Sequence, residues 1–452
     1  MKRAVVCAVL VLVTLSAYGQ ETMVLGYYPS YRHGSYPHTA IKFEHLTHLA
    51  HSFIWPHTSG SGALHVPAGF LYPAMIEAAH NAGVKVVIAL GGAGNNDGFG
   101  PAASDPGTRA VLVENIVDFV VDNGYDGVDL DWEGFSNSTY KDALSSLIED
   151  LDAALEAADP ALTLSMPLGA TNWHGAYDMP RVAEHLDWIA IMTYDLHGSW
   201  TTHAGHLSPL YPATGDSDHF SMHQSVDYWM ARSVPASKML AGIPFYGRQW
   251  EGVKALHGPT VGAVTALGYA GIEPLVETDG WVRHWDEVAR VPYLINEDEE
   301  RFITYEDPIS VAEKVEYVRT RNLQGLILWE ISHDYMPTGE QPLLVEAGKL
   351  LQDPVAIEDR PVPETDFVFE GNFPNPFSSS TRISFSTAAT AHVTIEVFDV
   401  LGRRVAILVD EVLPAGRHTA NLEASHLPSG IYVSRMRTGD VSRSISMLLI
   451  RL

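Results

Sequence analysis

Residues 125–135 read YDGVDLDWEGF and place four acids within eight positions: Asp126, Asp129, Asp131 and Glu133. In a β-strand, residues i, i+2 and i+4 share one face, so the last three acids point in the same direction. The residues between and beside them are apolar and point the other way. These apolar residues are Val128, Leu130 and Trp132. The stretch therefore predicts a strand with one acidic face and one apolar face.

An α/β barrel accommodates both faces of such a strand. The outer side of a barrel strand packs on helices, whereas residues near its carboxyl end line the active site. Three alternatives are a solvated loop, a calcium-binding loop and a purely structural acid cluster. A solvated loop does not explain the alternating apolar residues. A calcium loop of the EF-hand type would need Glu at the position of Tyr140. Burying unpaired charge without a function is costly, so we favour catalysis.

Eight short apolar runs alternate with helix-like segments along the first 350 or so residues. In the segment 140–159, leucines fall on one helical face, and Gly83 marks the end of the helix expected at 72–83. Eight strands alternating with helices predict a parallel TIM (β/α)8 barrel, with a small insertion at about 250–300 before the last strand. The expected strands are 23–28, 45–54, 84–92, 126–133, 162–168, 186–194, 238–246 and 323–330.

The length of 452 residues exceeds that of one ordinary domain of ~100–200 residues. Positions 1–19 combine a basic start with a short apolar run, which predicts a cleaved secretory signal peptide. We expect the barrel at 20–352, a linker rich in Pro and acids at 353–366, and a C-terminal all-β sandwich module at 367–452. In this last range strand-like alternation and turn signals replace the helical pattern.

Acids outnumber bases 55 to 28, giving a formal net charge of −27. Such a field repels phosphate backbones, so nucleic acid is not expected as a partner. Beyond the signal no segment has the ~20 apolar residues of a membrane-spanning helix. The single cysteine, Cys7, lies in the signal, so we expect no disulfide and no cysteine-based metal site. Histidines such as His197, His203, His206, His219 and His223 show no ligand pattern and are expected at loop surfaces. We also expect a monomer.

We call Asp129, Asp131 and Glu133, which share one face of the predicted strand, the acid row. Its chemistry suits a proton donor. Three neighbouring carboxylates cannot all ionise easily, so at least one proton is retained. Glu133, the outermost acid, is placed to hold a raised pKa and to protonate a leaving group.

The chain resembles the family 18 glycoside hydrolases, the chitinase family, over roughly residues 23–350. The acids of 126–133 match the family signature D-x-x-D-x-D-x-E in full. Met192, Tyr194 and Asp195 match a second motif, M-x-Y-D, and GIPFYGR at 242–248 matches a third. The last strand carries LWEISHD with Trp329, where such enzymes place a tryptophan floor.

The resemblance implies a secreted chitinase that cleaves β-1,4-linked N-acetylglucosamine polymers by a substrate-assisted retaining mechanism, without cofactor or metal. Glu133 would be the acid and then the base. Asp131 would hold the acetamido N–H of the substrate, Tyr194 its oxygen, and Asp129 would share a proton with Asp131. Alternatives are an endo-β-N-acetylglucosaminidase acting on glycans and a non-hydrolytic chitin-binding lectin. Expected substrate contacts are Trp329, Met192, Asp195, Tyr246, Arg248, Tyr27 and Phe53, and expected structural residues are Asp126, Gly91 and Gly92.

One position departs from the family pattern. The third-strand motif S-x-G-G reads Ala89-Leu90-Gly91-Gly92 here, so the hydroxyl that would bond the inner acids is absent. We expect Asp129 to keep its proton more readily as a result.

The C-terminal segment carries NFPNPF at 372–377, VFDVLGRRVAILVD at 397–410 and LPSGIYV at 427–433. It resembles the type IX secretion sorting domain of Bacteroidetes-like bacteria. The resemblance implies export machinery as a partner and a secreted or cell-surface location. A generic β-sandwich spacer or a carbohydrate-binding module is the alternative.

Overall fold

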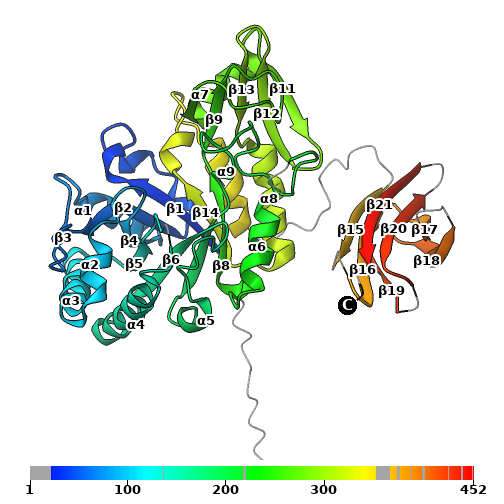
Figure 1. Cartoon of the computed structure of the whole chain (residues 1–452). Coiled ribbons are helices and arrows are strands. Elements are labelled where there is room, and N and C mark those ends of the chain that lie inside the picture. The colour runs from blue at the N-terminus through cyan, green and yellow to red at the C-terminus, as the bar shows by residue number, and fades with distance from the viewer. Residues whose placement is uncertain are drawn as a thin grey trace, which may run out of the picture. The chain divides into compact units, whose positions relative to one another are not determined.

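The structure is a computed structural model that describes residues 22–135, 137–216, 220–352 and most of 367–451. The predicted signal peptide and linker lie outside the described residues. Contacts divide the chain into two compact units, residues 1–354 and 355–452. Figure 1 shows the first unit as a barrel ringed by helices and the second as β-strands alone.

Eight parallel strands form the barrel, and their pairing closes through β1 and β2. All eight fall within the predicted runs or overlap them, which confirms the TIM barrel. Around the barrel the strands are β1 (Met23–Pro29), β2 (His48–Pro56), β4 (Lys85–Gly91), β5 (Gly127–Asp131), β6 (Thr163–Gly169), β7 (Trp188–Met192), β8 (Met239–Pro244) and β14 (Gly325–Trp329). The short β3 (Leu64–His65) pairs with the end of β2.

Helices cover the outside of this barrel because each presents one apolar face to the strands. The expected leucine stripe of α4 is buried, and α1 ends just before Gly83, whose φ is +77°. The helices of this layer are α1 (Pro73–Asn81), α2 (Phe99–Ser104), α3 (Pro106–Asn123), α4 (Lys141–Ala158), α5 (Met179–Val182), α6 (Met222–Met230), α8 (Pro308–Arg321) and α9 (Pro342–Gly348).

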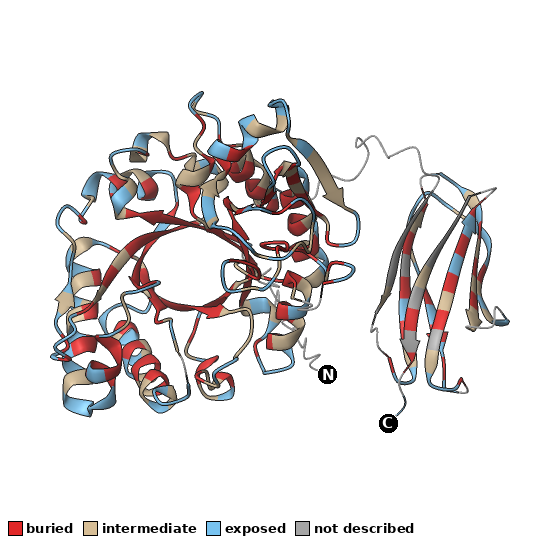
Figure 2. Cartoon of the chain, turned by 45° about the horizontal axis from the view of Figure 1, so that its top comes forward, coloured by how far each residue is buried: buried red, intermediate tan, exposed pale blue. Residues whose placement is uncertain are grey.

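Strand residues alternate between two cores. The odd-numbered side chains Leu25 and Val87 lie inside the barrel, whereas Val24 and Val86 pack outward on the helices. Viewed near the barrel axis, the buried strands form a closed ring (Figure 2). The apolar residues of the acid row join the outer core, as predicted. They are Val128, Leu130 and Trp132.

The predicted insertion is a five-stranded antiparallel sheet with a short helix, α7 (Tyr269–Ile272), between β8 and β14. It starts at Tyr246 and ends at Thr304, slightly wider than predicted, because β9 continues almost directly from β8. In sheet order its strands are β10 (Val264–Gly268), β9 (Tyr246–Glu251), β13 (Arg301–Thr304), β12 (Val291–Asn296) and β11 (Val282–Asp286).

The C-terminal unit is all-β, as predicted. A three-stranded and a four-stranded sheet share one apolar core that includes Phe385, Ile395 and Leu422. The strands are β15 (Phe367–Phe373), β16 (Ser380–Thr387) and β19 (Gly416–Glu423) in the first sheet, and β18 (Arg404–Leu413), β17 (Ala391–Asp399), β20 (Gly430–Thr438) and β21 (Val441–Leu449) in the second.

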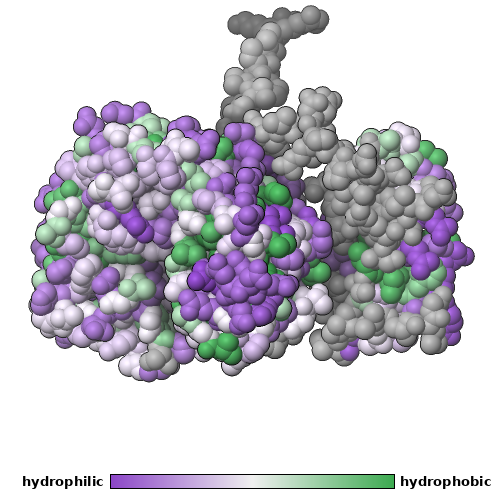
Figure 3. All heavy atoms as spheres, turned by 90° about the horizontal axis from the view of Figure 1, so that it is seen from above, coloured by the Kyte–Doolittle hydropathy of each residue, from purple (hydrophilic) through white to green (hydrophobic). Residues whose placement is uncertain are grey.

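In the part of the chain that the structure describes, no helix is both long and apolar enough to cross a bilayer. On the face shown in Figure 3, hydrophilic residues are interspersed with small hydrophobic patches.

Candidate functional site

The acid row rises through the interior of the barrel along β5. Asp129 pairs in register with Ala89 of β4 and is fully buried, and Asp131 pairs with Gly91 and is 4% exposed. Glu133 follows two residues after the strand and lines a cleft at its carboxyl end, as does Asp131. The three acids therefore run from the barrel core to the cleft floor.

Both carboxylate oxygens of Asp129 already accept hydrogen bonds from hydroxyl groups. Tyr27 Oη donates to Oδ2 at 2.6 Å, and Ser165 Oγ of β6 donates to Oδ1 at 2.7 Å. Burial raises the pKa of Asp129, and these two donors offset part of that rise. The hydroxyl missing at Ala89 is thus supplied from other strands, so the reason we gave for a protonated Asp129 does not hold.

Asp131 and Glu133 lie close enough that each carboxyl group shifts the pKa of the other. Burial raises the pKa of Asp131 well above its usual range, and the charges of Glu133 and Asp129 raise it further. Burial also raises the pKa of Glu133, while a hydrogen bond from Asp131 lowers it. The pair therefore retains a proton that isolated carboxyl groups would have lost.

Asp131 also offers an acceptor to the cleft. Its Oδ1 is buried and has no hydrogen-bond partner among the described residues, although the side chain lines the cleft. A buried polar atom without a partner is unusual in a folded protein. The atom is available to accept a hydrogen bond from a bound molecule.

Tyr194 and Tyr246 lie beside the acids and can donate hydrogen bonds through their hydroxyl groups. Burial raises the pKa of Tyr194 and of Tyr246 well above the usual value, and nearby carboxylates add to the effect in both. Both phenols therefore stay protonated. Tyr246 also shares a hydrogen bond with Asp195, and both tyrosines line the cleft.

Asp195 is held by Arg248 of the insertion. Arg248 Nε and Nη2 donate to Asp195 Oδ1 at 2.9 and 2.7 Å. The guanidinium also lies 4.8 Å from the ring centroid of Trp200. This contact joins the loop after β7 to strand β9 at the edge of the cleft.

Aromatic rings from three barrel strands form the apolar floor. Trp329 lies edge-on to Tyr27, with ring centroids 5.3 Å apart, and stacks on Phe53 at 5.7 Å. Met192, at the end of β7, also lines the cleft. Such a surface suits the apolar face of a sugar ring.

Gly91 and Gly92 allow the backbone of β4 to approach the acid row closely. Gly91 has φ +108°, and a Cβ there would lie 2.1 Å from the carbonyl oxygen of Asp131. Gly92 has φ +78°, and a Cβ there would meet the ring of Phe53 at 2.7 Å. Gly92 N also donates to the carbonyl oxygen of Asp131 at 2.9 Å.

Asp126 lies at the opposite end of β5. Its Oδ2 accepts from Val86 N at 2.6 Å and from His80 Nε2 at 2.8 Å. It is therefore separated from the cleft and serves the packing of β4 against β5.

Sequence reasoning missed several residues of the site. Asn96 Oδ1 accepts from Glu133 N at 2.9 Å, and the exposed rings of Tyr31, Trp173 and Trp200 line the cleft. These residues follow the carboxyl ends of barrel strands, and that position in the sequence could have identified them as candidates for the site. The cleft has a volume of about 950 Å³, and the residues lining it include Tyr27, Tyr31, Phe53, Asn95, Asp131, Glu133, Trp173, Met192, Tyr194, Asp195, Trp200, Thr201, Thr202, Phe220, Tyr246 and Trp329.

The expectation that the histidines lie at loop surfaces is wrong for two of them. His197 and His206 are fully buried, and His203 and His223 are half-buried. The loop after β7 packs against the insertion, where Ala204 N donates to Gly258 O at 2.8 Å and the ring centroid of His206 lies 5.7 Å from that of Tyr293. His219 lies outside the described residues.

Residues 23–334 match the model of the glycosyl hydrolases family 18, and the chain belongs to that family. Residues 372–450 match the secretion system C-terminal sorting domain, which indicates a protein that is secreted or held at the cell surface. Both matches confirm the resemblances noted in the sequence.

Individual relatives agree with this assignment. Chitinase A1 of Niallia circulans is 32% identical over 58% of this chain, which spans only 42% of that protein's length. The structure of catalytic domain 2 of the Ostrinia furnacalis group II chitinase is 27% identical, with a TM-score of 0.68 over 73% of this chain and 96% of that one. A family 18 N-acetylglucosaminidase from Paenibacillus barengoltzii is also 27% identical, with a TM-score of 0.66 over 73% of this chain and 100% of that one.

Proposed function

We propose that this protein is a secreted chitinase that hydrolyses β-1,4-linked N-acetylglucosamine polymers with retention of configuration and without an enzyme nucleophile. The observation that carries the proposal is the Asp131–Glu133 pair at the cleft floor, where Oδ1 of Asp131 has no hydrogen-bond partner among the described residues. Family 18 enzymes use the substrate's own acetamido group in place of a second carboxylate.

In the first step Glu133 protonates the glycosidic oxygen while the acetamido oxygen of the substrate attacks the anomeric carbon. The bond to the leaving sugar breaks, and an oxazolinium ion forms. Asp131 accepts the acetamido N–H and stabilises the positive charge, and Tyr194 donates to the acetamido oxygen. The raised pKa of Glu133 supports its role as acid, because it keeps the proton at higher pH.

In the second step Glu133, now ionised, removes a proton from water. The water oxygen attacks the anomeric carbon, the oxazolinium ring opens, and the product keeps its configuration. Asp129 exchanges a proton with Asp131 as the charge on Asp131 changes. The hydroxyls of Tyr27 and Ser165 stabilise the ionised form of Asp129 during this exchange.

We further propose that Trp329 stacks beneath the reacting sugar and that Met192, Asp195, Tyr246, Arg248, Tyr27 and Phe53 contact it or hold residues that do. The exposed rings of Trp173, Trp200 and Tyr31 extend the aromatic surface beyond the acid row. This extension supports an oligosaccharide rather than a single sugar as the ligand.

An endo-β-N-acetylglucosaminidase acting on glycoprotein glycans is the second candidate, because it would use the same acid row. The test is product analysis with soluble N-acetylglucosamine oligomers in parallel with a glycopeptide that carries an N-linked glycan. We expect oligomers to be cleaved and the glycopeptide to persist. Cleavage of the glycopeptide alone would favour the second candidate, and binding without cleavage of either would favour the lectin.

We also propose the domain boundaries given above, with the C-terminal module at 367–452 addressing the protein to the export machinery. Removing 367–452 should change export or surface retention and leave kcat on soluble oligomers within a few-fold, because every acid of the proposed site lies in the barrel. A folded but inactive truncated protein would contradict this division.

A further inference from the structure

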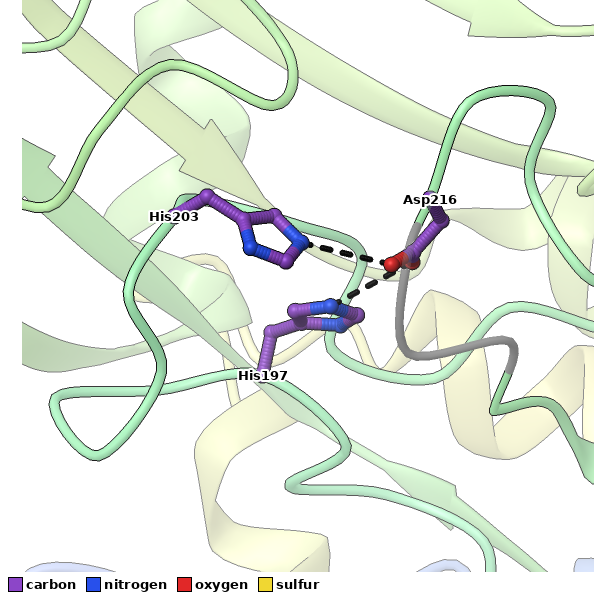
Figure 4. Close-up of side chains that lie close together, drawn as sticks. All are labelled: His197, His203 and Asp216. Atoms are coloured by element: carbon purple, nitrogen blue, oxygen red, sulfur yellow. Dashed lines mark hydrogen bonds and ion pairs between the residues drawn. The ribbon is translucent and has the colours of Figure 1, made fainter.

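Three side chains converge in the loop that joins β7 to α6, beside the cleft but outside the acid row. His197, His203 and Asp216 each direct one ligand atom toward the others, and these atoms all lie within 4.8 Å of one another (Figure 4). His197 Nε2 lies 3.3 Å from Asp216 Oδ2, and His203 Nε2 lies 3.3 Å from Asp216 Oδ1. We propose that these three residues bind one divalent transition-metal ion, and that Zn²⁺ suits them best.

The cluster is buried and held in place. The side chains of His197 and Asp216 are 0% and 1% exposed, and that of His203 is 13% exposed. The His197 ring packs directly on Gly205, where a Cβ would lie 2.4 Å from its Cδ2. Thr201 Oγ1 donates to the carbonyl oxygen of His203 at 2.8 Å. The ligands therefore need little rearrangement to bind an ion.

The hydrogen bond of His197 fixes which of its nitrogens can bind a metal. Nδ1 lies 2.9 Å from the carbonyl oxygen of His206, and only an N–H can donate to that oxygen. The neutral ring then has its lone pair on Nε2, which faces a carboxylate oxygen. Two acceptor atoms 3.3 Å apart repel each other unless a proton or a metal ion is shared between them. Metal-binding histidines commonly donate their other N–H to a backbone carbonyl in this way.

The donor set and its spacing favour zinc. Two imidazole nitrogens and one carboxylate oxygen are ligands that Zn²⁺ accepts, at about 2.0–2.2 Å in a tetrahedral site. Ligand atoms at that radius lie about 3.3–3.5 Å apart. Each imidazole nitrogen lies 3.3 Å from a different oxygen of Asp216, so a small rotation of the carboxylate would bring one oxygen to both. Ca²⁺ and Mg²⁺ prefer sites made of oxygen alone. Water would complete the tetrahedron.

A metal ion at this position would affect the wall of the cleft. The same loop contributes Trp200, Thr201 and Thr202 to the cleft wall, between His197 and His203 in sequence. An ion that ties His197 and His203 to Asp216 would fix this segment on both sides. The inference stands independently of the reaction proposed above, since it concerns metal binding and loop stability.

The test uses the full chain purified without a histidine tag, stripped with a chelator and dialysed. Zn²⁺ is then added, and its content is measured by mass spectrometry and its binding by calorimetry. We expect one tightly bound Zn²⁺ per chain and a rise in Tm of at least about 2 °C. Co²⁺ in place of Zn²⁺ should give the visible absorption of a tetrahedral site. If the stripped protein takes up no stoichiometric Zn²⁺, the three side chains form only hydrogen bonds and ion pairs with one another, and the proposal is overturned.

Variants locate the site. His203→Ala and Asp216→Asn should each lower zinc affinity by at least tenfold and remove the Tm rise. His203→Gln, which keeps the size of the side chain, serves if His203→Ala does not fold. His185→Ala is the matched control, because it removes a half-exposed His–Asp pair with Asp152 at 2.7 Å. Unchanged zinc binding in folded His203 variants, or equal loss in the control, would show that the ion binds elsewhere.

Discussion

The two ends of strand β5 carry the same kind of side chain in different surroundings. Before the strand, Asp126 is partly exposed and accepts hydrogen bonds from a backbone N–H and an imidazole. At the other end, Asp131 is buried, lies against other carboxyl groups and keeps one oxygen unpartnered among the described residues. A satisfied carboxylate contributes to stability, whereas a crowded and desolvated one is available for chemistry. The position along a barrel strand decides between these outcomes.

Replacement of the outermost acid should give the largest effect. Glu133→Gln keeps the size of the side chain but removes the proposed proton donor, so kcat should fall by ~10²–10⁴-fold or more while ligand binding is largely kept. The measurement is kcat on an unactivated oligomer together with calorimetric binding of the same oligomer. Near-normal turnover would show that Glu133 is not the acid.

Asp131→Asn should reduce kcat by about 10²–10³-fold, because it removes the charge that we propose faces the acetamido N–H and the cation. The variant should also change how stability depends on pH. The pKa of Asp131 is raised in the folded state, so its contribution is complete below the ordinary Asp pKa and is lost as pH rises toward the folded-state value.

Asparagine does not titrate, so the Tm difference between Asp131→Asn and the wild type should become more favourable to the variant as pH rises. The measurement is Tm at several pH values from about 4 upward. A difference that stays constant with pH would mean that the carboxyl group is not destabilised by ionisation in the folded protein.

Asp126→Ala should show the opposite pattern from the cleft acids. It leaves Val86 N without its acceptor, which should lower the free energy of unfolding by about 1–3 kcal/mol, while kcat changes little. Urea denaturation and kcat below the unfolding transition measure the two effects. Asp126→Asn is the matched control, because its amide oxygen can still accept from Val86 N. A loss of kcat as large as that at Asp131 would remove the distinction between the two ends.

Features of β5 that depend on local pattern could be predicted from the sequence, whereas features that depend on contacts with other segments could not. Alternation along 126–133 predicted which faces of β5 are acidic and apolar, because a strand has a period of two whatever surrounds it. The strand itself ends at Asp131, whose carbonyl oxygen accepts from Gly92 N as the last hydrogen bond of the β4–β5 ladder. Local pattern alone does not contain that contact.

Other parts of the site depend on how distant segments meet. Ser165 reaches Asp129 from the neighbouring strand, and no spacing in the sequence marks it as a partner. His197 and His206 are buried in the loop after β7, which packs on the insertion, whereas their loop position in the sequence suggested exposure. Trp173 and Trp200 line the cleft from loops whose conformation the strand pattern does not determine.

The smallest effect is expected at Ala89, inside the barrel beside Asp129. In Ala89→Ser the new hydroxyl would be a third donor to a carboxylate whose two oxygens already accept from Tyr27 and Ser165. A neutral hydrogen bond contributes only ~0.5–1.5 kcal/mol and one to a charged group ~1.5–3 kcal/mol, and one pKa unit corresponds to ~1.4 kcal/mol. We therefore expect the limbs of the kcat–pH profile to move by less than about two units.

The direction of that shift follows from the coupling in the acid row. An added donor favours ionised Asp129, whose charge raises the pKa of Asp131. Asp131 then keeps its proton and its hydrogen bond to Glu133, which lowers the pKa of Glu133, so the basic limb should move to lower pH. Ser165→Ala removes an existing donor and should move that limb to higher pH by a larger amount. If the Ala89→Ser limb moved by more than the Ser165→Ala limb, the two present hydroxyls would not be the groups that set the ionisation of Asp129.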